Sequence, residues 1–177
     1  MVINLKKEKL LDSWGVVIED SAGKQEYLLN LIQWRIEISE IPDISCQMIE
    51  ASTGLIKRLL GKKRTYLMIQ NRSLKDYKMY VGARDYGRNL DFSWFLTVEP
   101  GFFKSISSRL ITKALTKTSN PNALSFALDL FDQQDLRAYV TSVHRCCVKR
   151  AVEQLVAELG QQSTNFDWKS KGFLSVW

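Results

Sequence analysis

The stretch that decides the fold is YKMYVGARDYGRNLDFSWFLTV, residues 77–98. Apolar and polar residues alternate in its two halves, 77–86 and 90–98, which is typical of strands with one buried face. Gly87, Arg88 and Asn89 connect the halves, and glycine and asparagine tolerate the positive φ of tight hairpin turns. We therefore predict an antiparallel hairpin, which residues 64–72 (RTYLMIQNR) extend into a meander.

The N-terminal part of the chain predicts helices followed by a second hairpin. Apolar residues at helical spacing favour helices over residues 3–14 and 24–32. From Trp34 the apolar period changes to two, so residues 33–40 and 44–51 are interpreted as paired strands around Pro42-Asp43.

Two helices are expected after the meander. The first opens at Pro100-Gly101, and the second runs from residue 132 or 133 to about residue 159, where Gly160 ends it. One apolar stripe of the second helix should pack on the sheet: Leu136, Val140, Val143, Cys147, Ala151 and Leu155. The sequence thus predicts one α+β domain over residues 1–177, with an antiparallel sheet of four to five strands flanked by N-terminal helices and two C-terminal helices.

Composition indicates a globular protein of the cytoplasm. The chain has 177 residues, of which 45% are hydrophobic, and its three cysteines include the adjacent pair Cys146 and Cys147. This number and spacing do not suit a disulfide framework, so we expect free thiols in a reducing compartment. The N-terminus lacks the apolar region of a signal peptide, and no segment approaches the ~20 apolar residues of a membrane-spanning helix.

Charge is distributed unevenly behind a net value of +6. Residues 1–53 carry a net −4, residues 54–117 a net +10, and residues 118–177 are balanced. A basic block of this size favours a polyanionic partner. The alternative is that the acidic N-terminal third packs against the basic block and neutralises it.

The alternation of the meander assigns its residues to two faces. One face is continuously apolar and should be the core. The other interleaves cations with aromatic rings, a combination that suits nucleic acid because rings stack on unpaired bases and cations neutralise phosphates. The candidate anion-binding residues are Lys62, Lys63, Arg64, Tyr66, Lys78, Tyr80, Arg84, Tyr86 and Arg88. Two alternatives stay open. Helices cover this face too and the cations reach water at its edges, or the basic cluster around Gly61 is a solvated loop that only protects the sheet edge from pairing: Lys57, Arg58, Lys62, Lys63 and Arg64.

Three other sequence patterns give weaker support for a functional site. The glycines of residues 82–88 match no phosphate-binding motif, and Gly82 is interpreted as a bulge or a close approach. His144 and Cys147 share a helix face but lack an identifiable third catalytic group. Asp129, Asp132 and Asp135 recur every three residues, which helix capping explains for two of them.

The sequence therefore predicts no catalytic set, no metal site and no cofactor. The function that it favours is a non-enzymatic module that binds a polyanion, most of all nucleic acid, through the basic-aromatic face. The alternatives are a protein–protein adaptor, which would use the aromatic tail of residues 166–177, and a small-ligand domain with a cavity between the sheet and the long helix.

Overall fold

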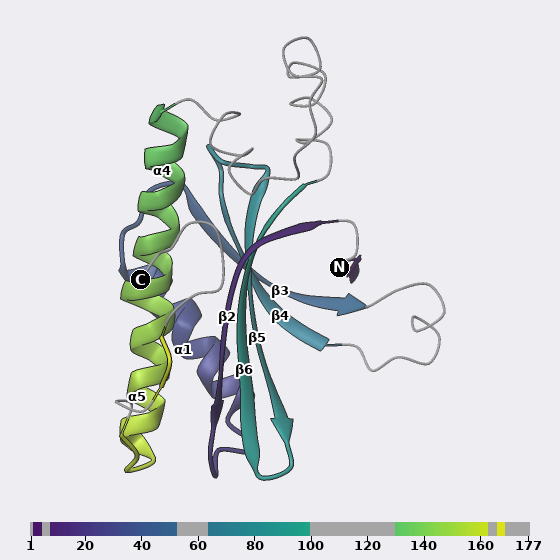
Figure 1. The fold of residues 1–177 in the computed structure, drawn as a ribbon, viewed down its shortest axis with the longest axis vertical. Helices are drawn as coiled ribbons and strands as arrows, with labels where there is room; N and C mark the ends of the chain where they lie inside the picture. The colour runs from purple at the N-terminus through teal and green to yellow at the C-terminus, as the bar shows by residue number, and fades with distance from the viewer. Residues whose placement is uncertain (1, 5–7, 53–63, 100–129, 163–165, 169–177) are drawn as a thin grey trace, which may run out of the picture.

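The computed structural model describes residues 2–4, 8–52, 64–99, 130–162 and 166–168, and their fold is α+β, as predicted (Figure 1). Five antiparallel strands form the sheet in the order β3-β4-β5-β6-β2, and the short β1 adds to β3 in parallel. The strands are β1 (Val2–Asn4), β2 (Lys9–Ile18), β3 (Ile44–Ser52), β4 (Arg64–Asn71), β5 (Tyr77–Tyr86) and β6 (Asn89–Val98).

The meander of β4, β5 and β6 is confirmed. Tyr86 pairs with Asn89, so Gly87 and Arg88 alone make the turn between β5 and β6. Gly87 has φ 65°, a backbone conformation that side chains with a Cβ rarely adopt. Glycine at this position therefore permits the tight connection that aligns the two longest strands of the meander.

The helix predicted over residues 3–14 is wrong where the structure describes it. Residues 9–14 belong to β2, which pairs antiparallel with β6 and buries Trp14 and Ile18. The pairing register shifts between Leu10 and Asp12, which marks a β-bulge or a similar irregularity. Because such a shift interrupts the period of two, the adjacent pair Leu10-Leu11 imitated a helical pattern.

The strand predicted over residues 33–40 is also wrong. One helix, α1 (Gln25–Ile38), occupies almost all of the segment, and the predicted pairing of residues 33–40 with 44–51 does not occur. Ile36 is buried, but Trp34 and Ile38 are exposed. The apparent period of two arose because α1 has apolar residues on its outer side as well as its inner side. Residues 44–51 are strand, within β3, and pair with β4.

The long C-terminal helix is confirmed. It consists of α4 (Leu130–Thr141), the π-helical segment η3 (Ser142–Lys149) and α5 (Arg150–Glu158). Its predicted apolar stripe is buried throughout and packs with α1 against one face of the sheet (Figure 1), which we call the core face. The helix predicted from Pro100 lies outside the described residues.

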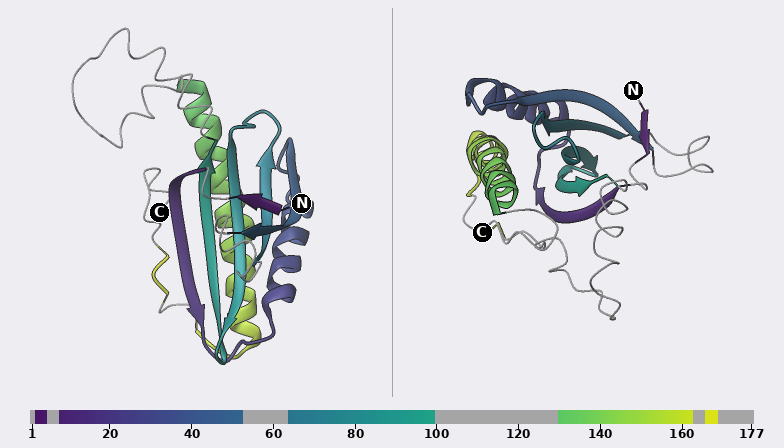
Figure 2. Two further views of the ribbon diagram at one scale, coloured as in Figure 1. Left: turned by 90° about the vertical axis from the view of Figure 1, so that its right-hand side faces the viewer. Right: turned by 90° about the horizontal axis from the view of Figure 1, so that it is seen from above.

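Part of the aromatic tail docks on the body of the protein. The Trp168 ring stacks on Trp14 with ring centroids 5.0 Å apart, and Trp14 Nε1 donates a hydrogen bond to the Asp167 carbonyl at 2.8 Å. Lys149 Nζ lies 4.7 Å from the centroid of the Trp168 ring. Residues 166–168 thus contact β2 through Trp14 and the C-terminal helix through Lys149, and the left view of Figure 2 shows the segment beside β2. Residues 169–177 are outside the described part.

Candidate functional site

The predicted basic-aromatic face is the side of the sheet turned away from the helices, which we call the outer face. Its centre is a small second core made by Ile49, Tyr66 and Tyr80, with Met68 and Phe95 packed against it. Tyr80 is 0% exposed and Tyr66 9%, whereas Tyr86 is 73% exposed. Of the three tyrosines proposed to stack on bases, only Tyr86 presents its ring to solvent.

Gly82 makes the close packing of Tyr66 possible. A Cβ built on Gly82 would lie 2.5 Å from Cε1 of the Tyr66 ring, far inside van der Waals contact. The ring therefore lies directly over the backbone of β5. The close approach expected at Gly82 is confirmed, although a ring makes it. No bulge occurs there, because the β5–β6 register runs through Gly82 without a shift and the β4–β5 pairing ends regularly at Tyr66 and Gly82.

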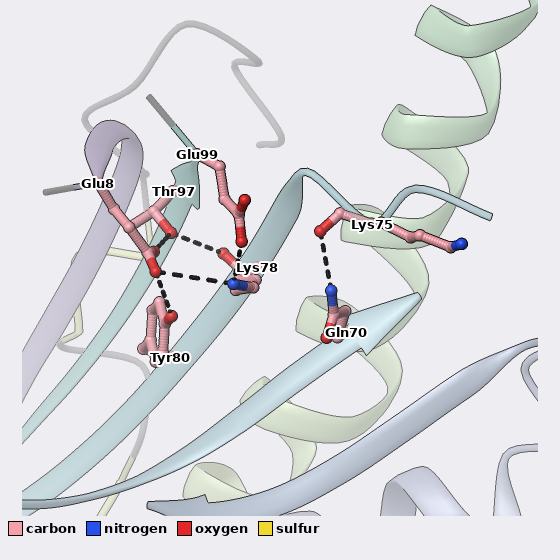
Figure 3. A network of polar contacts seen from close by, with 7 residues as sticks. All are labelled: Glu8, Gln70, Lys75, Lys78, Tyr80, Thr97 and Glu99. Atoms are coloured by element: carbon pink, nitrogen blue, oxygen red, sulfur yellow. Dashed lines mark hydrogen bonds and ion pairs between the residues drawn. The ribbon is translucent and has the colours of Figure 1, made fainter. Parts of the chain in front are cut away.

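A polar network occupies the outer face where β2 begins and β6 ends (Figure 3). The buried Glu8 carboxylate accepts hydrogen bonds from the Tyr80 hydroxyl, at 2.7 Å, and from the Thr97 hydroxyl. Lys78 Nζ lies 2.5 Å from Glu99 Oε1 and 3.9 Å from Glu8 Oε1. Burial, and next the hydrogen bond to Glu8, raise the pKa of the Tyr80 hydroxyl. The positive charge of Lys78 therefore neutralises acidic groups of its own chain, and the network links the start of β2 to β5 and β6.

Arg84, Tyr86 and Arg88 come together at the tip of the β5–β6 hairpin. Arg84 Nη2 lies 2.5 Å from Asp91 Oδ2, and Arg88 Nε lies 3.0 Å from Asp20 Oδ1. The Arg88 side chain is nevertheless 79% exposed. Exposed ion pairs of this kind contribute little to stability, so another anion can take the place of the carboxylate.

The remaining candidate cations lie away from the hairpin tip or outside the described part. Arg64 is exposed at the start of β4, and Lys62 and Lys63 are outside the described residues. The described residues include 13 of the 25 lysines and arginines but 18 of the 19 aspartates and glutamates. The described part of the chain is thus acidic overall, and the basic excess belongs to residues that it does not include.

His144 and Cys147 are both buried in the core, each with different neighbours. The His144 ring meets Trp94 and Trp14 edge-on, with centroids 4.9 and 5.4 Å away. The Cys147 Sγ instead donates to the Arg35 carbonyl of α1 at 3.7 Å. Burial lowers the pKa of His144 to about 3 and raises that of Cys147. Both shifts oppose an activated thiolate–imidazolium pair.

The surface that sequence reasoning missed is the outward side of α1. Tyr27, Trp34 and Ile38 are 40%, 51% and 55% exposed, and the partly buried Leu31 lies between them. The four residues, which we call the α1 stripe, are spaced by four, three and four positions, so they share one side of the helix. This spacing is present in the sequence, but the interpretation of residues 33–40 as a strand divided the helical pattern between two elements.

Comparison with models of protein families, with characterised proteins and with solved structures found no match to this chain.

Among the described residues, no group of three or more His, Cys, Asp or Glu side chains is arranged to hold a metal ion. Asp129 lies outside them, and Asp135 is exposed on α4. None of the described helices is long and apolar enough to cross a membrane.

Proposed function

We propose that this protein is a non-enzymatic protein-binding module whose docking surface is the α1 stripe. The observation that carries the proposal is the exposure of Tyr27, Trp34 and Ile38 in one line on one helix. Single exposed apolar residues are common on protein surfaces, but a contiguous row is typical of an interaction site. Tryptophan and tyrosine are also the side chains that most often dominate binding energy at interfaces.

Contacts with the C-terminal helix hold the α1 stripe in place. The Tyr27 hydroxyl donates to the Glu158 carboxylate, with distances of 2.8 and 2.9 Å to its two oxygens. Arg35 Nη2 donates to Gln154 Oε1 at 2.6 Å. Because these contacts fix α1 before any partner arrives, binding loses less conformational entropy than it would on a mobile helix. An apolar helix face of a partner would fit such a row of side chains.

Site-specific photo-crosslinking in cells that naturally produce the protein tests the proposal. A photoreactive phenylalanine analogue replaces Trp34 in one variant and Phe131, which is exposed on α4 outside the α1 stripe, in the control. We expect an adduct of one discrete mass at position 34 and little at position 131. Adducts of equal yield at both positions, or at neither, would contradict a docking surface on α1.

Polyanion binding is a second candidate, favoured by the exposure of Arg84, Tyr86 and Arg88 together at the hairpin tip. It ranks below protein binding because Arg84 and Arg88 are paired with acidic side chains of the same chain, and because two of the three candidate tyrosines are buried. The test is titration of a fluorescent single-stranded oligonucleotide at rising salt, which should weaken binding steeply. The double change Arg84→Ala and Arg88→Ala should reduce the affinity at least tenfold, and an unchanged affinity would exclude the hairpin tip as the site. Nothing in the described residues favours the small-ligand alternative.

A further inference from the structure

We infer that the α1 stripe pairs with the α1 stripe of a second copy of this chain, the two helices lying antiparallel about a two-fold axis. The inference rests on the proposed function, because it names the partner of the same surface. The order and the size of the residues in the stripe favour this pairing.

The spacing of the stripe is the same in both directions. Its steps of four, three and four residues are unchanged when the helix is reversed, so in a two-fold antiparallel pair every stripe residue can lie level with a stripe residue of the other copy. With the axis between residues 32 and 33, Tyr27 faces Ile38 of the second copy and Leu31 faces Trp34. Docking on a heterologous partner would not need a spacing that reads the same in both directions.

The sizes of the side chains favour the antiparallel arrangement over the parallel one. In the antiparallel pair each aromatic ring meets an aliphatic side chain, so large and small residues alternate along the contact. A parallel pair would instead set Trp34 against Trp34 and Tyr27 against Tyr27, which crowds two rings at each level.

The polar flank of the stripe is compatible with the same pairing. Asn30 and Glu37 are exposed on one side of the stripe, and in the antiparallel register Asn30 of each copy lies near Glu37 of the other. An amide can donate to a carboxylate there, and two carboxylates do not face each other.

The area available predicts a weak dimer. The three exposed side chains offer on the order of 300 Å² of apolar surface per copy, if a large side chain buries roughly 150–250 Å² when fully covered. A standard stable interface takes about 800 Å² from each partner. The dimer should therefore form only at concentrations of about ten micromolar or more, unless other surfaces add to it.

Sedimentation velocity of the purified full-length chain tests the association itself. The weight-average sedimentation coefficient should rise with concentration from the monomer value toward that of a dimer. Trp34→Asp should weaken the association at least tenfold, and Ile38→Asp should act in the same direction with an unchanged melting temperature. Phe131→Asp is the matched control, because Phe131 is 77% exposed on α4 and lies off the stripe. A wild-type chain that stays monomeric at about 500 µM, or a Trp34→Asp variant that associates normally, would overturn the inference.

Disulfide trapping tests the antiparallel register. Chains carrying Tyr27→Cys are mixed with chains carrying Ile38→Cys, both with Cys146→Ser because Cys146 is an exposed thiol. The mixture should form several-fold more disulfide dimer than either chain alone, since like positions would lie about 16 Å apart along the helices, beyond the reach of a disulfide. Equal yields in all three samples would refute the register.

The outcomes separate this inference from the proposed function. A crosslinked adduct at Trp34 with twice the mass of the chain agrees with the dimer. An adduct of another mass, together with a monomeric purified protein, would refute the dimer and leave the docking surface in place.

Discussion

The buried His144 should make the stability of this protein depend on pH. Its imidazole is 0% exposed between the rings of Trp14 and Trp94. Burial lowers the pKa of His144 from the ordinary value of 6.5 to about 3, and the positive charges of Lys149 and Arg145 act in the same direction. The folded chain therefore keeps this ring neutral at a pH where the unfolded chain protonates it.

The sign and the size of the effect follow from proton linkage. As pH falls below 6.5, the imidazole becomes protonated in the unfolded state but stays neutral in the folded state until pH approaches 3. The free energy of unfolding therefore keeps its full value above pH 6.5 and decreases below it. The loss is about 1.4 kcal/mol for each pH unit in this window, or about 2 kcal/mol at pH 5.

Urea denaturation at pH 7.5, 6 and 5, followed by circular dichroism, measures the free energy of unfolding. The measurements stop at pH 5 because hydrogen bonds from Gln154 and Tyr27 lower the pKa of Glu158, whose titration would add to the loss in stronger acid. The matched variant is His144→Gln, which cannot take up a proton in this range and should keep its stability within about 0.5 kcal/mol from pH 7.5 to 5. If the wild-type and variant proteins lose stability in parallel, the reasoning about His144 is refuted.

Three other predictions concern packing and thiols. Val143 is 0% exposed, so Val143→Ala should lower the free energy of unfolding by about 1–3 kcal/mol in urea denaturation, and a loss below about 0.5 kcal/mol would mean that the helix packs differently. The Gly82→Ala change should lower the melting temperature because the new Cβ meets the Tyr66 ring. In a Tyr66→Ala background the same change should lower the melting temperature much less, and equal decreases in the two backgrounds of this double-mutant cycle would contradict the contact. A thiol reagent should label the exposed Cys146 quickly and the buried Cys147, whose pKa burial raises, only on unfolding; rapid native labelling of Cys147 would contradict its burial.

The parts of the fold that the sequence predicted are those where local pattern and tertiary environment agree. The strands β5 and β6 alternate because one face meets the helices, and the C-terminal helix repeats its apolar residues because one stripe meets the sheet. The errors fell where that agreement fails. A register shift near Leu10 interrupts the alternation of β2, and α1 leaves Trp34 and Ile38 in solvent.

The candidate site was harder to predict because its electrostatics are long-range. The sequence identified Lys78, Arg84 and Arg88 as cations near aromatic rings, but it did not identify their acidic neighbours. Lys78 lies near Glu8, and Arg88 pairs with Asp20, each across more than 60 residues of sequence. The burial of Tyr80 depends on the same tertiary arrangement, so no local pattern contains it.

The pairing of β2 with β6 has a consequence for how the chain is made. Lys9 pairs with Val98, so β2 leaves the ribosome before its partner strand β6, whose far end follows 89 residues later. At roughly 5–20 residues per second, β2 waits for about 5–20 s without its strand partner. During this interval, in which α1, β3, β4 and β5 are synthesised, the unpaired backbone of β2 is open to mispairing with neighbouring chains.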